Sequence, residues 1–532
     1  MTLRASVLLA VALTIAPRWT LVAATAADAR SAQTWPGADL FTNGAVERVS
    51  IELSATNLAA LKEDARSFVR ATVREAATTY SDVAIHLKGS VGSFRPIDDK
   101  PALTLDFDRF NDGQRYHGLR RIHLNNSVED PSYANEQLGS QVFRAAGVPA
   151  PRAGHAVVTL NGRRLGLYVL KEGFTEDFLG CYFKQVGGNL YEPDEGHDVN
   201  QVLKRNSIHA PHRKSAALEA LAQAALEPDP ERRWQRLEPL LDLDEFIRFM
   251  ALEVMLGHRD GYSLARNNFR VYENLDTGKV VFFPHGMDQL LGNPALPWQP
   301  QMAGLVARAV MTTPKGHQLY RESFMNLFTN LFNAAGLSRA VKELPGQLGP
   351  WLSPSELAEL KAAGEQVSAR LSQRRRYLAS QLTQPEPGLL QLTNGVGCLS
   401  GWVNGEEPGS GSMDAGRSAD GTPSLHISVH ADSAASWRTK TLLGPGRYRF
   451  EGRARVAGVK PLAYGRRQGA GLRIAGSDAA WTGLLGDAPW RTVATEFAVP
   501  GGPATVECIC ELRAQSGEVW FDTQSLKIIT LE

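Results

Sequence analysis

The feature of this sequence that most constrains its fold is a change of hydrophobic periodicity along the chain. Apolar and polar residues alternate, as in half-buried strands, in VERVSIEL (46–53), SDVAIHL (81–87) and ALTLDF (102–107). Helical spacing takes over from about Lys214, and short alternating runs return after the TQPEPG stretch at 383–388. This order predicts a domain of strands followed by helices, and then a separate all-β module.

The chain length agrees with two folded units, because 532 residues are too many for one hydrophobic core. We expect an α+β domain over residues 36–383, strand-rich to about residue 200 and helical beyond. A linker at 384–388 then leads to a β-sandwich of jelly-roll type at 389–532. The net charge of +1 speaks against a protein that binds nucleic acid or a membrane surface over its whole face.

The first residues have the pattern of a signal peptide, which we place at 1–27. Arg4 precedes the apolar run from Ala5 to Ile15, and small residues follow it. The alternative is a single membrane anchor, but Pro17 interrupts the apolar stretch well before bilayer length. We therefore expect an exported protein, periplasmic, extracellular or at the cell surface, with no transmembrane segment in the mature chain.

Two local signals are strong enough to predict single elements. Residues 131–146 are expected to form a helix, with Asp130 as its N-cap and Pro131 at its first position. The dipeptide Asn161-Gly162 lies between two alternating runs and predicts a β-hairpin.

The four cysteines are too few for a disulfide scaffold and lack the spacing of a zinc site. In an exported protein, one bridge from Cys398 to Cys508 or Cys510 is expected. Only one of the latter two can pair with Cys398, because alternate residues share one face of a strand.

The segment 244–292 contains the best candidates for chemistry. An apolar helix is followed by HRDGYSLARNN, a strand pair and HGMDQLLG. A kinase-type phosphotransferase needs one carboxylate beside the attacking hydroxyl and another that holds a metal ion, on loops separated by a short hairpin. Asp260 and Asp288 occupy these two places. The alternatives are that both are capping residues and that His258 is a packed core histidine, a role we favour for His258.

A family resemblance rests on several motifs in order: LKGS (87–90), the Lys100 segment DDKPALTLDFD, LNGRRLGLYVLKE, GGNLYE, HRDGYSLARNNFRVY and FFPHGMDQLLG. Over roughly residues 45–295 the chain resembles the CotH kinase family. The resemblance implies a two-lobed, protein-kinase-like fold that uses ATP with Mg²⁺ or Mn²⁺. It also implies a substrate among secreted or surface proteins.

The resemblance also implies roles for individual residues. Asp260 becomes the catalytic base, Asp288 the main metal ligand, and either Asn267 or Asn268 an assisting ligand. There are two departures. The asparagines lie seven and eight residues after Asp260 rather than at the shorter protein-kinase spacing, although this resembles the CotH pattern. In addition, CotH relatives often carry Trp-Asp-x-Asp where this chain has His285-Gly286-Met287-Asp288. One acidic ligand is therefore missing at Gly286.

Four further residues are candidates for nucleotide binding. Lys100 and Glu136 could form the ion pair that holds ATP phosphates in kinases, and Lys88 opens a glycine-containing turn whose amides could face phosphates. Glu172 resembles the position where such folds meet the adenine. The alternative roles are a solvated surface charge for Lys100, an exposed helix residue for Glu136, a plain turn after Lys88 and a helix-terminal charge for Glu172.

The C-terminal module adds a possible binding function. Its tryptophans could stack on sugars, although most tryptophans in sandwiches belong to the core; they are Trp402, Trp437, Trp481, Trp490 and Trp520. The favoured reading is an exported ATP-dependent protein kinase acting on hydroxyl groups of secreted or surface proteins. The rival reading is a catalytically inactive scaffold or adhesion protein whose β module binds glycan.

Overall fold

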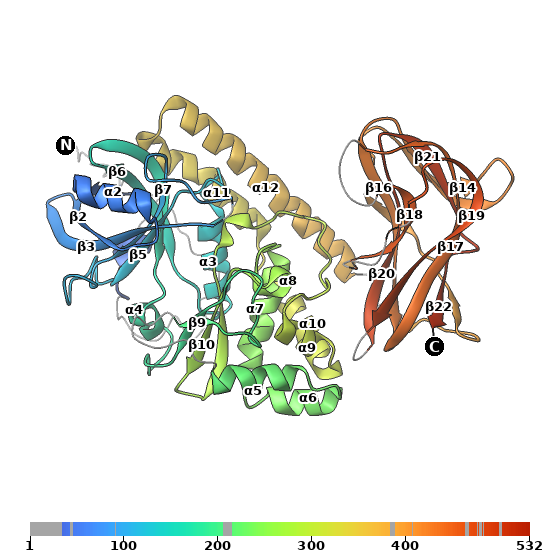
Figure 1. The fold of residues 1–532 in the computed structure, drawn as a ribbon, viewed down its shortest axis with the longest axis horizontal. Helices are drawn as coiled ribbons and strands as arrows, with labels where there is room; N and C mark the ends of the chain where they lie inside the picture. Colours follow the sequence, from blue (N-terminus) through green and yellow to red (C-terminus); the bar gives the residue numbers. More distant parts are fainter. Residues whose placement is uncertain are drawn as a thin grey trace, which may run out of the picture.

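The computed structural model describes residues 35–531 apart from 43–45, 91, 206–214, 384–388, 407, 463–467, 476, 478–480, 482 and 500–502. The expected signal peptide and linker therefore lie outside the described residues. Figure 1 shows strands, then mainly helices, then strands again in chain order, which is a mixed α and β fold. None of the helices within the described ranges is long and apolar enough to cross a membrane.

The first seven strands close into a barrel in the order β1-β2-β3-β4-β5-β7-β6, with a parallel β1–β6 pair completing an otherwise antiparallel ring. Apolar residues such as Ile85, Leu105 and Leu124 pack in its core, so the alternate positions on these strands face outward. The strands are β1 Val46–Glu52, β2 Val69–Glu75, β3 Thr78–Lys88, β4 Ala102–Asp106, β5 Arg121–Asn125, β6 Ala153–Leu160 and β7 Arg163–Glu172.

The predicted hairpin at Asn161-Gly162 is confirmed. Strands β6 and β7 pair on either side of these two residues, and both have a positive φ, +47° for Asn161 and +77° for Gly162. Positive φ at both central residues is the geometry of a tight hairpin turn of type I′, which asparagine and glycine adopt most easily.

The predicted helix at 131–146 exists but starts later than expected. Helix α3 runs over Asn135–Ala145, and Ala134 is its N-cap. Asp130 does not cap the helix directly; its carboxylate accepts hydrogen bonds from the backbone N–H of Ser132 (3.1 Å) and of Asn135 (2.9 Å). Asp130 therefore orders the turn that precedes the helix, where Tyr133 has a φ of +54°.

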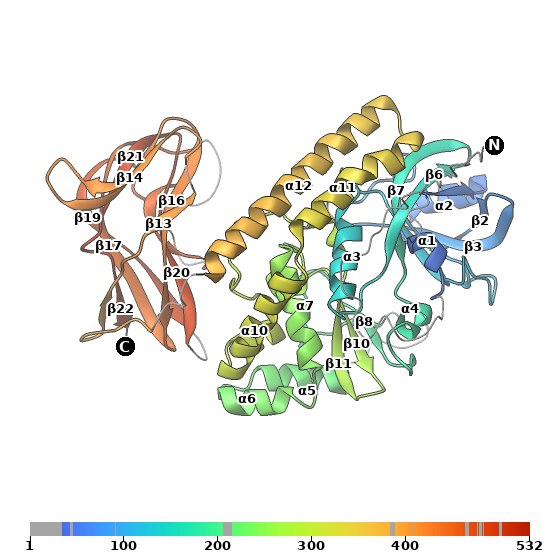
Figure 2. The same cartoon turned by 180° about the vertical axis from the view of Figure 1, so that it is seen from behind.

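The middle of the chain packs helices around α7, whose residues are almost all buried. A single apolar cluster extends from α3 to α12, and Figure 2 shows α3 between the barrel strands and α7. The helices are α1 Ala38–Thr42, α2 Ala55–Glu63, α4 Glu176–Gly180, α5 Ala216–Ala225, α6 Pro230–Leu237, α7 Leu243–Met255, α8 Tyr262–Ala265, α9 Leu305–Met311, α10 Pro314–Asn330, α11 Ala334–Leu348 and α12 Pro354–Leu382.

A small sheet, in the order β11-β10-β8-β9, lies in the same part of the chain. Its strands are β8 Leu190–Glu192, β9 Lys204–Arg205, β10 Phe269–Asn274 and β11 Lys279–Pro284. The β10–β11 pair is the short hairpin expected between the two candidate carboxylates, and it keeps one register along its whole length.

The strands after α12 form two sheets that share one apolar core. One has the order β12-β22-β17-β21-β15-β14, with β19 also paired to β17, and the other has the order β13-β16-β20-β18. The strands are β12 Val396–Cys398, β13 Val403–Glu406, β14 Gly411–Arg417, β15 Pro423–Val429, β16 Ser433–Leu443, β17 Gly446–Lys460, β18 Gly469–Ile474, β19 Gly486–Val499, β20 Ala504–Ala514, β21 Ser516–Asp522 and β22 Lys527–Leu531.

The expected disulfide is not formed, and all four cysteines carry free thiols. Cys398 is exposed on β12, whereas Cys508 and Cys510 are buried on β20 of the other sheet. Burial raises the pKa of both β20 thiols, as expected for cysteines that serve as small core residues.

Candidate functional site

The loops that carry Asp260 and Asp288 meet through an asparagine. The Asp260 Oδ2 atom accepts hydrogen bonds from the side-chain amides of Asn267 (3.1 Å) and Asn268 (3.3 Å). The Asn268 amide also donates to the carbonyl of Gly286 (3.3 Å), two residues before Asp288. Asn268 therefore bridges the two loops, which favours it over Asn267 as the residue that assists Asp288.

His258 forms a second bridge between the same loops. It is fully buried, and its Nε2 lies 3.1 Å from the Gly286 carbonyl, to which it donates when protonated at that nitrogen. Burial by itself lowers the pKa of His258, but the buried Glu253 carboxylate 3.6 Å away outweighs this effect and raises that pKa. The structural role favoured for His258 therefore includes holding the Asp288 loop.

The expected Lys100–Glu136 ion pair is wrong, because Glu136 pairs with Lys171 instead. Both partners of the Lys171–Glu136 pair are buried, at 0% and 2% side-chain exposure. Lys100 instead donates to the hydroxyl of Tyr133 (2.6 Å) and lies against the rings of Tyr133 and Tyr168. The signal for Lys171 was its place within the apolar strand segment LYVLKE, where a lysine needs a buried partner.

Helix α3 holds the Asp288 loop as well as Lys171. The second Glu136 carboxylate oxygen accepts the backbone N–H of Met287 (2.9 Å), and the Asn135 side chain donates to the Asp288 carbonyl (2.8 Å). A Cβ atom at Gly139 would lie 2.5 Å from the Met287 sulfur, so the loop approaches the helix as closely as glycine allows. One helix thus positions both a cation and a candidate metal ligand.

The surroundings of Asp288 disfavour the ionised form of its carboxylate. Burial, together with the charges of Glu136 and Glu129, raises its pKa to about 6. A divalent cation bound there would relieve this cost, and carboxylate and amide oxygens are ligands that Mg²⁺ and Mn²⁺ accept. Asp288 and Asn268 therefore fit a metal ion by the chemistry of their donor atoms.

The backbone conformation at Gly286 disfavours an acidic side chain at this position. Gly286 has a φ of +52°, and a Cβ atom there would lie 2.6 Å from the Asn268 side chain. An aspartate at this position would be strained and would displace the bridging asparagine. Within the described ranges, no cluster of three or more His, Cys, Asp or Glu side chains has the geometry of a metal site.

Lys88, predicted to open a phosphate-facing turn, lies at the end of β3 beside the end of β5. Its ammonium group donates to the Asn125 side-chain oxygen at 2.5 Å. Burial and the charge of Lys171 lower the pKa of Lys88 to about 8, while the charges of Glu136 and Asp288 act in the opposite direction. The contact with Asn125 fixes Lys88 to the end of β5, and its role in binding a nucleotide stays a prediction.

The carboxylate of Glu172, the candidate for meeting the adenine, is bound within the protein. Its oxygens are occupied by Arg152, which donates from its backbone N–H (3.1 Å), from Nε (3.0 Å) and from one terminal nitrogen. Both side chains are nearly inaccessible, at 3% and 2% exposure. The sequence pattern could not show this partner, because Arg152 lies 20 residues away, immediately before the neighbouring strand β6.

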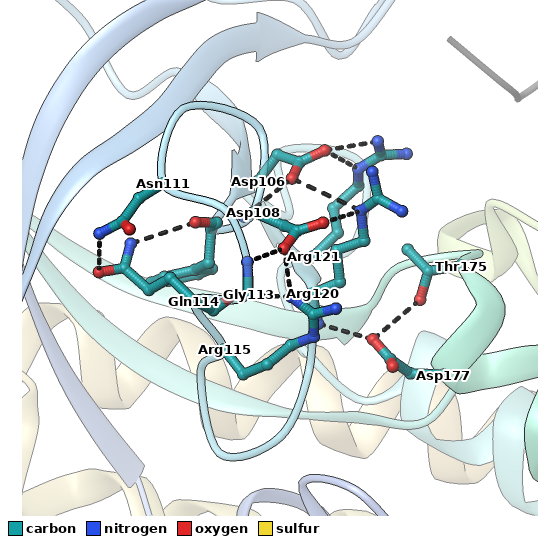
Figure 3. A network of polar contacts seen from close by, with 11 residues as sticks. Asp106, Asp108, Asn111, Gly113, Gln114, Arg115, Arg120, Arg121, Thr175 and Asp177 are labelled. Atoms are coloured by element: carbon teal, nitrogen blue, oxygen red, sulfur yellow. Dashed lines mark hydrogen bonds and ion pairs between the residues drawn. The ribbon is translucent and has the colours of Figure 1, made fainter. Parts of the chain in front are cut away.

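Arginines crowd the barrel end beside this site, but carboxylates neutralise them. Figure 3 shows Arg115, Arg120 and Arg121 facing Asp106 and Asp108. The Arg121 guanidinium lies 2.6 Å from Asp106, and Arg120 lies 3.2 Å from Asp108. These arginines therefore stabilise the turn between β4 and β5 rather than leaving positive charge for a ligand.

The five tryptophans of the C-terminal region differ in how accessible their rings are to a sugar. Trp437 is buried, Trp402 packs on the core and stacks on Phe450, and the Trp481 indole donates to a backbone carbonyl. Trp520, on β21, stacks with His426 of β15 and lies under Arg455 of β17. Because β15 and β17 pair with opposite edges of β21, both faces of Trp520 are covered.

Comparison with known proteins gives one family match. The family model described as CotH kinase protein matches residues 85–380. Inner spore coat protein H of Bacillus subtilis is 25% identical over 198 residues, which cover 34% of this chain and 53% of that protein. Invasin CotH2 of Rhizopus delemar is 25% identical over 200 residues, covering 34% and 33%. The chain thus spans about half or less of the length of these curated relatives.

Among solved structures, the proinflammatory kinase CtkA of Helicobacter pylori aligns with 52% of this chain and 94% of its own, at a TM-score of 0.26 and 8% identity. A Golgi casein kinase with bound Mn/ADP aligns with 62% and 78%, at a TM-score of 0.23 and 9% identity.

Proposed function

The chain belongs to the CotH kinase family, and from this premise we propose that it is an exported ATP-dependent protein kinase. It transfers the γ-phosphoryl group of ATP to hydroxyl groups of secreted or surface proteins. The observation that carries this proposal is the convergence of Asp260, Asn268 and Asp288 with the buried Lys171–Glu136 pair. In kinases, parts of this kind position the nucleotide and the attacking hydroxyl.

The same proposal includes a finer reading of the fold. The barrel and α3 form one lobe and the helices around α7 the other, with the site between them. The two sheets after α12 form a β-sandwich.

Asp260 has the geometry of a general base. The hydrogen bonds to its carboxylate from other described residues fall on Oδ2, which leaves Oδ1 to accept the proton of a substrate hydroxyl. Lys171, oriented by Glu136, holds phosphate oxygens through its positive charge. A divalent ion held by Asp288 and Asn268 would neutralise phosphate charge when bound.

A thermal-shift experiment on the full chain tests this function. ATP with Mg²⁺ or Mn²⁺ should raise the melting temperature, because a ligand that binds only the folded state stabilises it. Incubation with labelled ATP should then transfer phosphate to the chain itself or to a generic protein substrate. A shift without transfer in any condition would leave a nucleotide-binding protein that is not a kinase.

The second candidate function is the inactive scaffold, and the glycine at position 286, where CotH relatives often carry an acidic ligand, favours it. The C-terminal module would then bind glycan. Of its tryptophans, Trp490 is the best candidate, since its indole N–H is fixed by Asp420 at 2.6 Å and Arg453 lies 5.6 Å from its ring centre. Glycan binding that Trp490→Ala abolishes, combined with no nucleotide binding, would support the scaffold.

A further inference from the structure

A buried glutamate that the proposed reaction does not use holds the loop that carries Asp260. Glu253 lies two residues before the end of α7 and is 0% exposed. Its Oε1 atom accepts the backbone N–H of Tyr262 at 2.8 Å, and its Oε2 atom accepts the backbone N–H of Ser263 at 2.8 Å. Both oxygens of one buried carboxylate are therefore bound to the segment directly after Asp260.

These two amides need a partner because of the way in which α8 begins. Helix α8 lies beside α7 (Figure 1), and Tyr262 and Ser263 supply its first two N–H groups. The first amides of a helix have no partner within it, and a side chain at the N-cap usually accepts them. Here the N-cap is Gly261, which has no side chain. Glu253 thus serves as a cap that reaches α8 from another helix.

The contact with Glu253 also requires glycine at the N-cap. A Cβ atom at Gly261 would collide with the Glu253 carboxylate and would lie 2.7 Å from Nδ1 of His258. A serine or aspartate therefore does not fit at position 261, and the usual local cap is replaced by a buried, distant one. Burial of a carboxylate is costly unless hydrogen bonds satisfy it, and the two amides of α8 do so here.

The start of α8 controls the position of Asp260, because the loop closes on itself. The backbone N–H of Asn268 donates to the Asp260 carbonyl at 2.8 Å, and the side-chain amides of Asn267 and Asn268 donate to the Asp260 carboxylate. Between Asp260 and Asn267 lie α8 and its C-cap Arg266, which has a left-handed φ of +57°. A shift of α8 therefore moves Asp260 relative to both asparagines.

A second anchor keeps this loop folded when Glu253 is changed. The Tyr262 hydroxyl donates to the buried Asp198 carboxylate at 3.0 Å and accepts the backbone N–H of Val306, on α9, at 2.9 Å. These bonds attach α8 to α9 on the side away from its N-terminal amides. A change at Glu253 should therefore displace the loop rather than unfold it.

We infer that Glu253 is a positioning residue for Asp260: it fixes the start of α8 and so sets the rate of phosphoryl transfer without contributing to nucleotide affinity. The inference rests on the proposed function for the reaction itself. A catalytic group that is displaced by about 1 Å can lose roughly a hundredfold in rate. The groups proposed to hold the nucleotide and its metal ion, Lys171 and Asp288, are instead fixed by α3 through contacts that do not involve Glu253.

The kinetics of phosphoryl transfer by the full chain test this role. Glu253→Gln keeps the shape of the side chain but replaces one acceptor oxygen by an NH₂ group that faces a backbone donor. We expect kcat to fall by roughly tenfold to a hundredfold, whereas KM for ATP with Mn²⁺ should stay within about twofold of wild type.

Glu245→Gln is the matched control, since it makes the same change on the same helix. Glu245 is 4% exposed, and its carboxylate oxygens have no hydrogen-bond partner among the described residues. Burial raises the pKa of Glu245 well above its usual value, so the neutral amide resembles the native, protonated side chain. This variant should keep kcat within about twofold of wild type.

A double-mutant cycle shows whether Glu253 acts through Asp260. Once Asp260→Ala has removed the general base, Glu253→Gln should lower the residual turnover by less than about twofold, because the group that Glu253 positions is absent. Additive losses would mean that Glu253 supports the fold in general, and they would overturn the inference.

Hydrogen exchange gives a readout that does not require activity. The amides of Tyr262 and Ser263 should exchange at least roughly tenfold faster in Glu253→Gln than in wild type, while amides of β4 and β5 keep their wild-type rates. Unchanged exchange at the two amides, or equal losses of turnover in Glu253→Gln and Glu245→Gln, would overturn the inference. A wild type that transfers no phosphate would contradict the kinase proposal, and exchange at the two amides would then decide whether Glu253 holds the loop.

Discussion

Asp260 and Asp288 lie on neighbouring loops, yet their surroundings give them different roles in the proposed reaction. Asp260→Ala should keep nucleotide binding and lose roughly a hundredfold or more in turnover, the usual effect of removing a general base. Asp288→Ala should lose metal-dependent stabilisation as well as turnover, because Gly286 offers no replacement ligand. Thermal shift with ATP and Mn²⁺, beside a phosphotransfer assay, separates the two. Equal activity in both variants and wild type would refute the site.

The raised pKa of Asp288 predicts how metal binding depends on pH. Only the ionised carboxylate binds a cation, so protons compete with Mn²⁺ as the pH falls through about 6. Well below that pH, Mn²⁺ affinity should fall by about tenfold per pH unit, the slope for one competing proton. Calorimetric titration from pH 7.5 to 5 measures it, and Asp288→Asn should bind weakly with no such slope.

The same shift affects stability in the absence of metal. The folded-state pKa lies above the unfolded value of about 3.9, so the folded chain holds this proton more tightly. The contribution of Asp288 to stability should therefore fall as the pH rises from about 4 to about 6 and stay constant above that. Asp288→Asn should lack this component.

The sequence allowed Asp260, Asp288 and both asparagines to be proposed because they lie close together in the chain, around a predictable hairpin. It did not reveal that Glu136 pairs with Lys171, which depends on how β7 packs against α3 after the barrel closes. Lys100 was the wrong choice for a similar reason. Its place in a segment that resembles the family suggested the ion pair, whereas in the fold its ammonium group lies against the rings of Tyr133 and Tyr168.

At the scale of elements, α12 holds the end of α7 through one arginine. Arg374 is fully buried and donates to the carbonyls of Val254 (2.7 Å) and Met255 (3.0 Å), the last residues of α7. Helix ends leave such carbonyls without intrahelical partners, so the guanidinium serves as a distant C-cap. It also bonds the carbonyl of Leu296, which ties the segment after the Asp288 loop to the same point.

Arg374→Met should therefore be strongly destabilising. It leaves several buried carbonyls unsatisfied, and we expect a loss of about 3 kcal/mol or more in the free energy of unfolding. Arg370→Met, one turn earlier on the exposed side of α12, should stay within about 0.5 kcal/mol of wild type. Chemical denaturation measures both, and similar values for the two would contradict the capping role.

Local sequence patterns predicted which helices and turns form better than they predicted the residues at which these elements begin and end. The Asn161-Gly162 hairpin followed from turn chemistry alone. Helix α3, in contrast, starts four residues later than predicted, because Asp130 bonds Ser132 and Asn135 in a turn instead of capping a helix. An acidic residue before proline is compatible with both arrangements, and only packing against α7 and the Asp288 loop decides between them.

At the scale of the whole molecule, the sequence predicted the order of strands, helices and strands, but it could not predict that the first strands close into a barrel. Closure depends on the parallel pairing of β1 with β6, which are about a hundred residues apart. Alternation in a strand shows which side chains share a face and says nothing about the neighbouring strand.

The distribution of the apolar cores predicts how the whole chain unfolds. One cluster joins α3 to α12, and another contains only residues from Leu399 onward. The strands after α12 have this second core to themselves, whereas the barrel core lies in the same family-matched region as the first cluster. We therefore expect two calorimetric transitions in the full chain, and ATP should raise only one of them. Ile247→Val in the first cluster and Ile528→Val in the second are matched probes, each costing about 0.5–1.5 kcal/mol. Ile247→Val should lower the transition that ATP raises, and Ile528→Val should lower the other. A single transition that both variants lower would mean that the chain unfolds as one cooperative unit, against the two-domain reading of its sequence.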